Sequence, residues 1–392
     1  MYFNLRNIPC SYVACFNVLL MFLTYRYGVF EKYIQITQEE LEPMFLKKQF
    51  KHSAALFTAC SLLAAAVLTG CGQSSASTGE ATGDNPYNQV TLLLSCNGTD
   101  TANDTRAAQL FAEMMHERTD GAVTVNVFPN DQLSSGSQNK AIELVAGGTV
   151  DLDLRSTSIL ASLDNRIMVS TLPWLFPDYQ AAEDAFFGTG GEFLDTVLEP
   201  KGLTYIGAVH NGFKAMTTSK RPIREPKDLK GLKFRIPGGD FFTAFYSALG
   251  ASPQGMSWSE VFTALQQGTI DGQDNSLSTI NSANVQEVQK YISLTNHTYE
   301  AFTFVGNSKR LDSLNEATRA LLFETAEEAC REINKDAIAE ESEIREKFEL
   351  EGCEVIELAP EAVEEFKQTV APVTEKYKAI YGEEACRAFG VE

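Results

Sequence analysis

Basic residues and histidines are scarce in this sequence. Its 392 residues include 32 Lys and Arg against 52 Asp and Glu, so the formal net charge is −20. A surface this acidic repels phosphate backbones and anionic lipid headgroups, which disfavours nucleic-acid binding and docking on membranes through a basic patch. The histidines beyond residue 70, His116, His210 and His297, are too far apart in the sequence to suggest a metal site. We therefore predict neither a bound metal nor a nucleic-acid partner.

Long apolar runs and known catalytic motifs are also missing. No apolar run reaches the length of about 18 residues that a transmembrane helix needs, so no bundle of membrane-spanning helices is expected. The sequence has no Gly-x-Ser-x-Gly, no His-Glu-x-x-His and no P-loop motif. The glycine-rich segment 188–193 does not match the dinucleotide-binding motif, because the last glycine of that motif is missing. We therefore assign no catalytic residue and no cofactor, and we predict that the chain is not an enzyme.

The amino-terminal region has the order of a bacterial secretory signal. Residues 44–70 have lysines at positions 47, 48 and 51, continue with a mostly apolar stretch at 54–68 and end on small residues before Cys71. The last four positions, Leu-Thr-Gly-Cys, resemble a lipobox, in which the Cys is acylated and becomes the first mature residue. We expect a lipoprotein held at the outer face of the cell membrane by lipid on Cys71. Residues 1–43 are interpreted as a spurious upstream extension.

The segment that follows predicts a flexible tether and a globular body. Residues 71–87 are rich in Gly, Ser and Thr and have almost no apolar side chain that could compensate for the entropy cost of ordering. The body after them is about 300 residues long, which is large enough for two domains. Of the whole chain, 44% of the residues are apolar. Its four cysteines, Cys96, Cys330, Cys353 and Cys386, are widely and irregularly spaced, which leaves open whether they form disulfides.

The body alternates strand and helix patterns, which predicts an α/β fold. The expected strands are 90–94, 123–128, 150–154, 204–209 and 232–236. The expected helices are 105–119, 139–146, 257–267, which Ser257 and Glu260 would cap, and 315–350. At 1.5 Å per residue the last of these reaches roughly 50 Å, so we interpret it as a strut across two lobes.

Two arginines stand at predicted strand ends. Arg235 precedes a Pro-Gly-Gly turn, and Arg155 precedes Ser156. In open α/β sheets ligands bind beyond the carboxyl ends of strands, and the planar guanidinium matches a carboxylate bidentately. The two arginines therefore suggest one anionic ligand held from both sides, although pairing with a neighbouring Asp is an alternative for Arg235.

The segment GLKFRIPGGDFFTAFYSALGASPQGMSWSEVFTALQQGTIDGQDNSLSTI at 231–280 resembles the solute-binding proteins of tripartite ATP-independent periplasmic (TRAP) transporters, the dicarboxylate-binding family. The resemblance extends from about residue 88 onward. Its most specific feature is the Arg-Ile-Pro turn followed 40 residues later by the Asn of DGQDN. Further blocks support it: NVFPNDQL at 126–133, LVAGGTVDLDL at 144–154, LPWLF at 172–176 and HNGFKAMTTSKRPI at 210–223.

The resemblance implies roles for individual residues. Arg235 would form the salt bridge to a ligand carboxylate, Asn275 would help to fix that carboxylate, and Trp258 would wall the pocket. Lys214 stands where many members have Arg. A lysine keeps the positive charge but lacks the planar guanidinium that can pair with both oxygens of a carboxylate. The remaining candidates for ligand binding are Asn211, Asn103, Ser156 at a position that varies with substrate, and Arg155, which is not a fixed family feature.

The resemblance also implies an architecture and a mechanism. It predicts a two-lobe fold like that of periplasmic binding proteins, with a ligand cleft between the lobes and a long helix spanning both. Lobe 1 would comprise 85–210 and 301–340, and lobe 2 would comprise 211–300 and 341–392. The closed protein would deliver an organic or sugar-acid carboxylate to a permease of one small and one large membrane subunit, driven by an ion gradient.

Two alternatives stay open at this point. One is a secreted α/β enzyme acting on a small acid, with Arg235 as a clamp and Cys96 or a carboxylate as the chemical group. The missing nucleophile motif and the absence of a His near Cys96 in the sequence argue against it. The other is a binding protein that feeds a sensor. The sequence identifies neither the solute nor the coupling ion.

Overall fold

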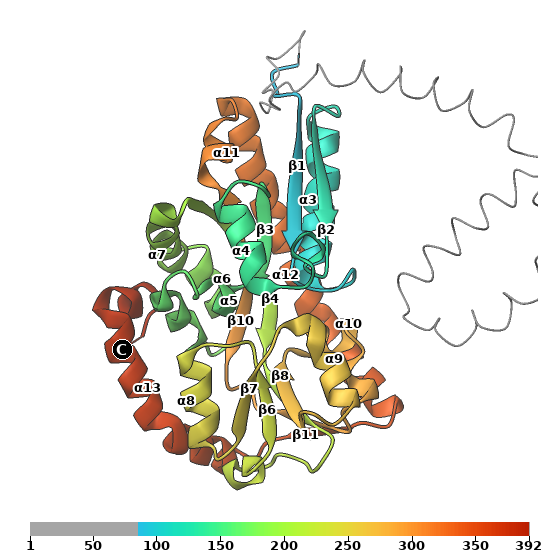
Figure 1. Cartoon of the computed structure of the whole chain (residues 1–392), viewed down its shortest axis with the longest axis vertical. Helices are drawn as coiled ribbons and strands as arrows, with labels where there is room; N and C mark the ends of the chain where they lie inside the picture. The colour runs from blue at the N-terminus through green and yellow to red at the C-terminus, as the bar shows by residue number, and fades with distance from the viewer. Residues whose placement is uncertain (1–84, 392) are drawn as a thin grey trace, which may run out of the picture. The chain divides into compact units, whose positions relative to one another are not determined.

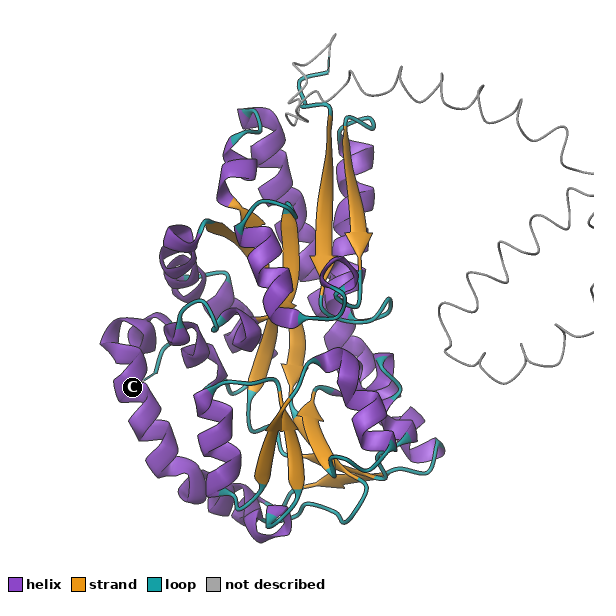
Figure 2. Cartoon of the chain, in the orientation of Figure 1, coloured by secondary structure: helices purple, strands orange, loops and turns teal. Residues whose placement is uncertain are grey.

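The structure is a computed structural model that describes residues 85–391, in which strands and helices alternate along the chain (Figure 1). The predictions for the upstream extension, the signal at 44–70, most of the tether and Cys71 lie outside the described residues. Figure 2 shows two groups of strands with helices along their flanks.

The first sheet has five strands in the order β2-β1-β3-β10-β4. Strand β1 is parallel to β2 and β3, whereas β10 runs antiparallel to both β3 and β4. The strands are β1 (Val90–Cys96), β2 (Val123–Phe128), β3 (Leu152–Ser156), β4 (Leu203–Phe213) and β10 (Tyr299–Asn307).

The second sheet has six strands in the order β11-β9-β5-β8-β6-β7. Strand β6 is parallel to β7 and β8, and β5 is antiparallel to β8 and β9. The strands are β5 (Ala215–Thr218), β6 (Lys233–Ile236), β7 (Ser252–Gly255), β8 (Gly272–Asn275), β9 (Tyr291–Leu294) and β11 (Glu354–Glu357). The chain therefore passes from one sheet to the other between β4 and β5 and returns between β9 and β10.

The helices are α3 (Asn103–Arg118), α4 (Gln138–Ala146), α5 (Thr157–Leu160), α6 (Tyr179–Phe186), α7 (Thr189–Leu198), α8 (Asp240–Ala248), α9 (Trp258–Gln266), α10 (Leu277–Ser282), α11 (Ser308–Asp312), α12 (Glu316–Leu350) and α13 (Pro360–Ala388). Short 3-10 turns lie at Gln132–Ser134, Asn165–Thr171, Glu199–Lys201, Pro226–Leu229 and Val285–Glu287. The prediction for Ser257 is confirmed, because it forms a capping box with Glu260 at the start of α9.

Helix α12 is the long helix that the sequence predicts. Asn315 caps it by accepting a hydrogen bond from the backbone N–H of Thr318. Leu322 and Ile333 in its first half pack into the core of the first sheet, and Ile344 and Phe348 near its end pack into a cluster beside the second. One rigid element is thus anchored in both cores.

The predicted strand 150–154 is displaced by two residues. Thr149 and Val150 instead donate hydrogen bonds to the carbonyl oxygen of Leu144 and close the end of α4. Strand β3 therefore begins at Leu152, and Arg155 lies inside the strand and not beyond it. This shift changes the role of Arg155.

Candidate functional site

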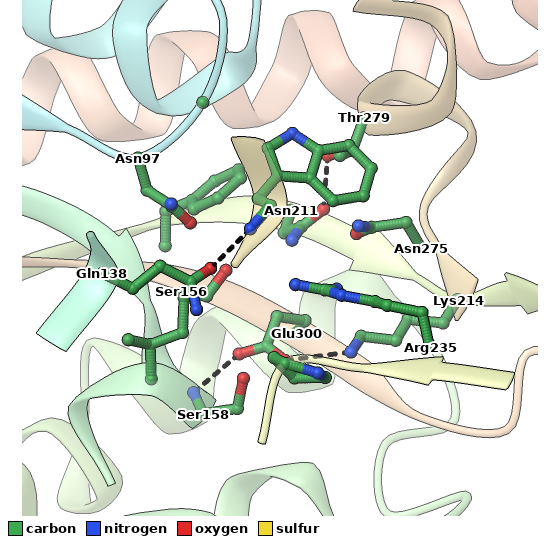
Figure 3. A pocket seen from close by; sticks show the side chains of 15 residues that line it. Asn97, Gln138, Ser156, Ser158, Asn211, Lys214, Arg235, Asn275, Thr279 and Glu300 are labelled. Carbon is green, nitrogen blue, oxygen red and sulfur yellow. Dashed lines mark hydrogen bonds and ion pairs between the residues drawn. The ribbon is translucent and has the colours of Figure 1, made fainter. Parts of the chain in front are cut away.

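A polar cavity lies where β6, β8 and the start of α9 meet the ends of β1 and β3. It encloses about 380 Å³ of empty space when the part that opens to solvent is included. Figure 3 shows Arg235, Lys214 and Asn275 on one side of it, Asn97 and Gln138 on the other, and Glu300 between Lys214 and Ser158. The lining residues are Asn97, Gly98, Gln138, Ser156, Ser158, Ile159, Asn211, Lys214, Arg235, Pro237, Trp258, Asn275, Thr279, Glu300 and Phe302.

Arg235 enters this cavity from β6, next to the Pro-Gly-Gly turn. It is only 3% exposed, and its Nε and Nη2 atoms donate to the carbonyl oxygen of Met256 at 3.2 and 3.0 Å. Its guanidinium lies 5.4 Å from the ring centroid of Trp258, within reach of a cation–π interaction. Among residues 85–391, no carboxylate lies within 4.0 Å of this guanidinium. Burial accordingly lowers the pKa of Arg235 to about 10.

Lys214 is buried at the crossing between β4 and β5, but its charge is already compensated. Its Nζ atom lies 3.2 Å from Oε2 of Glu300 and 3.6 Å from Oδ2 of Asp274. Burial alone would raise the pKa of Asp274, yet Lys214 and His297 outweigh it and hold that pKa well below its usual range. Asp274 therefore stays ionised beside Lys214.

Asparagines complete the side of the cavity nearest the second sheet. Asn211, in β4, accepts hydrogen bonds on Oδ1 from Ser276 at 2.8 Å and from Thr279 at 2.7 Å. Asn275, at the end of β8, accepts one from the backbone N–H of Ser276 at 3.3 Å. Because these oxygens are occupied, the amide N–H groups are the remaining donors that an acid could use.

Hydrogen bonds also connect the two sides of the cavity. Gln138, the first residue of α4, accepts a hydrogen bond on Oε1 from the backbone N–H of Trp258 at 3.1 Å. The next residue, Ser259, donates to the carbonyl oxygen of Gly136 at 3.2 Å. Asn97 follows β1 and donates to Oδ2 of Asp131 at 2.9 Å. Contacts between segments far apart in the sequence thus bridge the two sides of the cavity.

The structure brings six of the eight predicted ligand-binding residues to this cavity, namely Arg235, Asn275, Trp258, Lys214, Asn211 and Ser156. Arg155 and Asn103 do not line it.

The prediction that Arg155 holds the ligand from a second side is wrong. Its side chain is 0% exposed and donates from Nε and Nη2 to Asp153 at 2.9 and 3.0 Å. Nη2 also lies 2.8 Å from Oδ1 of Asp131. Although burial opposes the charged form, the two carboxylates raise the pKa of Arg155. Two buried aspartates need a counter-ion, and Arg155 supplies it.

Asn103 also has a structural role instead of the predicted contact. It begins α3, and its Nδ2 atom donates to the carbonyl oxygen of His210 at 3.0 Å and to Oγ of Ser278 at 3.3 Å. It therefore connects α3 with β4 and α10, beside the cavity but not in it.

Several lining residues escaped the sequence reasoning, among them Asn97, Gln138, Ser158, Thr279 and Glu300. The rule for strand ends could have found Asn97, since it directly follows β1. No sequence pattern marks Glu300 as a site residue, because every residue of β10 is buried and the strand shows no alternation of apolar and polar residues.

The described residues hold no other chemical centre of the kinds considered above. The four described cysteines are unpaired, and Cys96 is fully buried, which raises the pKa of its thiol and makes it unsuited to be the nucleophile, one of the two chemical groups that the enzyme alternative considered. Among residues 85–391, no group of His, Cys, Asp and Glu could hold a metal ion. Within the same residues, no helix is both long and apolar enough to cross a membrane.

The structure has two sheets with helices along their flanks, and the chain connects them between β4 and β5, between β9 and β10 and through the long helix α12. Together with the polar, cationic cavity, this arrangement defines a two-lobe ligand-binding protein. The family model for the bacterial extracellular solute-binding protein, family 7, matches residues 95–380, and the chain belongs to this family. It is a TRAP-type solute-binding protein and not an enzyme.

Individual relatives agree with this assignment. The C4-dicarboxylate-binding periplasmic protein of Rhodobacter capsulatus is 32% identical over 72% of this chain and 85% of its own length. Among solved structures, the sugar acid binding protein of Advenella mimigardefordensis, in complex with galactonate, has a TM-score of 0.74 at 29% identity and matches 77% of this chain and 97% of its own. A TRAP periplasmic solute-binding protein of Shewanella oneidensis with bound succinate has a TM-score of 0.73 at 30% identity and matches 76% of this chain and 98% of its own.

Proposed function

We propose that this protein captures a small organic or sugar-acid carboxylate in the cavity and delivers it to an ion-driven TRAP permease of one small and one large membrane subunit. The observation that carries the proposal is Arg235, a buried cation that lines a polar cavity and has no carboxylate within 4.0 Å among the described residues. Burying an unpaired charge is costly, so a ligand carboxylate would relieve the cost and gain two parallel hydrogen bonds. Relatives solved with galactonate and succinate support the ligand class.

In this proposal the neighbours of Arg235 fix the same carboxylate. Asn275 and Asn211 would donate from their amide groups, Trp258 would cover the ligand, and Ser156 would contact its far end. Lys214 would influence the ligand carboxylate electrostatically but would not form paired hydrogen bonds with it, because two acidic groups already compensate its charge.

We also propose that residues 85–210 with 301–340 form lobe 1, and that residues 211–300 with 341–392 form lobe 2. A solute that touches both lobes would favour the closed form by its differential affinity. The strand crossings near Lys214 and before Tyr299 would then serve as hinges.

A lipid anchor at the outer face of the cell membrane is the remaining part of the proposal. Cys71 would be acylated after cleavage of the signal at 44–70, and the tether would hold the body near the permease. Mass spectrometry of the mature amino terminus would detect the acylated Cys71, and a mature chain that still begins before residue 44 would contradict the proposal.

The ligand-binding role is tested by calorimetry on the wild-type protein and an Arg235→Ala variant. A thermal-shift screen over organic and sugar acids supplies the ligand, since a ligand at 100 times its dissociation constant adds about 2.7 kcal/mol of stability. Removing one partner of a buried charge pair costs about 2 to 5 kcal/mol, so affinity should fall roughly 30-fold to several thousand-fold. Arg235→Lys should recover only part of the loss, because an ammonium lacks the planar fork.

The matched control is Arg224→Ala, which removes an arginine whose side chain is 57% exposed and lies outside the cavity lining. It should bind as the wild type does. Unchanged affinity in a folded Arg235→Ala protein would contradict the carboxylate anchor.

A further inference from the structure

Glu300 is an acidic residue in a cavity otherwise suited to anions. It lies in β10, is 1% exposed and lines the cavity. Its Oε1 atom accepts a hydrogen bond from the backbone N–H of Ser158 at 2.9 Å, and its Oε2 atom lies 3.2 Å from Nζ of Lys214. Figure 3 shows the carboxylate extended between these two residues. Glu300 is therefore held in place from both lobes of the family fold.

The charges around the cavity leave one cation available to a ligand. The charged lining residues are Arg235, Lys214 and Glu300. Lys214 is paired with both Glu300 and Asp274, whereas Arg235 is not within 4.0 Å of any described carboxylate. One ligand carboxylate can pair with Arg235. A second carboxylate in the same ligand would find no free cation and would meet the negative charge of Glu300.

Two buried polar atoms of the lining favour a hydroxyl group on the ligand. Oε2 of Glu300 and Oγ of Ser158 are both buried and have no hydrogen-bond partner among the described residues. A hydroxyl can donate to the first and accept from the second, which satisfies both. An ammonium group would also suit Glu300, but Lys214 Nζ already lies 3.2 Å away and would repel it.

We propose that the solute is a hydroxylated monocarboxylate, and that Glu300 is a specificity-determining residue that accepts a hydrogen bond from a ligand hydroxyl and excludes dicarboxylates. The inference rests on the proposed function, because it takes Arg235 as the anchor of the single carboxylate. It goes beyond the proposed function by assigning a role to Glu300 and by distinguishing hydroxy acids from dicarboxylates, two ligand classes that Arg235 alone would bind equally well.

The test compares acids of equal chain length on the purified protein by calorimetry. Erythronate carries one carboxylate and several hydroxyls, succinate carries two carboxylates, and butyrate carries one carboxylate without hydroxyls. Galactonate, adipate and hexanoate repeat the comparison for a longer chain. We expect at least one of the two hydroxylated acids to bind at least about tenfold more tightly than its dicarboxylate and its unsubstituted counterpart, because a lost hydrogen bond to a charged group costs about 1.5 to 3 kcal/mol.

The variant Glu300→Gln keeps the shape of the side chain and removes its charge. It should weaken hydroxy-acid binding about 10- to 100-fold and strengthen succinate binding by a similar factor, since the negative charge that repels a second carboxylate is removed. Glu346→Gln is the matched control, because Glu346 is exposed on α12 and lies outside the cavity lining. It should change neither affinity.

The outcomes separate the inference from the proposed function. If dicarboxylates bind the wild type as tightly as hydroxy acids, or if Glu300→Gln leaves the preference unchanged, the inference is overturned while the carboxylate function stands. If no acid of any class binds, the proposed function fails, and the inference fails with it. Should Glu300→Gln not fold by circular dichroism, the preference of the wild type alone decides.

Discussion

At the scale of single residues, charge compensation decides which buried arginine is available to a ligand. Arg155 and Arg235 are both almost fully buried and both lie near the ends of parallel strands. Arg155 is paired with Asp153 and Asp131, so its charge belongs to the core. Arg235 donates to a carbonyl oxygen and lies against the ring of Trp258, with no carboxylate within 4.0 Å among the described residues, so its charge is free to bind an acid.

This difference predicts opposite effects on stability. Arg155→Met leaves two buried carboxylates without a counter-ion and should lower the free energy of unfolding by about 3 to 5 kcal/mol. Arg235→Met removes an unpaired buried charge and should change it by less than about 1 kcal/mol in the absence of ligand. Urea denaturation of both variants, without ligand, measures the two values. Equal destabilisation by the two substitutions would mean that Arg235 is also part of the core.

At the scale of elements, α12 joins two cores through different parts of its length. The helix has 35 residues and is about 50 Å long. Its first half packs on the first sheet, and Ile344 and Phe348 pack with Val261 and Ile292 beside the second. The helix therefore connects the two cores directly.

The end of α12 offers a matched pair of substitutions. Phe348 is 0% exposed, whereas Leu350, two residues later, is 89% exposed. Phe348→Ala leaves a cavity and should lower the free energy of unfolding by about 3 to 5 kcal/mol. Leu350→Ala should stay within about 0.5 kcal/mol of the wild type. Thermal or urea denaturation measures both, and a small effect of Phe348→Ala would show that this end of the helix is not anchored.

At the scale of the described molecule, the cavity is covered by a small number of polar contacts across it. Besides the contacts of Gln138 and Ser259, Thr99 donates to the carbonyl oxygen of Ser282 at 3.2 Å. Such single hydrogen bonds contribute about 1 kcal/mol each, so they can break and re-form during function. We interpret the structure as the closed form of a protein that opens to exchange solute.

Closure predicts a change in dimensions. Small-angle scattering should show a smaller radius of gyration when a saturating solute is added, because the solute favours the closed form. The Arg235→Ala variant is the control and should not contract at the same solute concentration. A wild-type protein that binds solute without any contraction would contradict the hinge mechanism.

The sequence by itself determined those features that depend on neighbours along the chain. The alternation of strands and helices, the capping box of Ser257 and Glu260, and the long helix at 315–350 follow from residues within a few positions of one another. The family followed from short blocks such as the Arg-Ile-Pro turn and DGQDN. Strand β10 and helix α13 were not predicted, because β10 is buried along its whole length and α13 contains Pro372 and a kink at Gly382.

Only the tertiary structure decided the partners of the charged groups. Arg155 meets Asp131, and Lys214 meets Glu300, across long separations in the sequence. In a sequence with 52 acidic residues, no local pattern indicates which carboxylate a given cation will meet. Charge pairing in a buried site depends on distance and on the exclusion of water, and both arise only when the sheets and helices pack together. For this reason the sequence could nominate Arg235 and Arg155 alike, and the fold alone could tell the free arginine from the paired one.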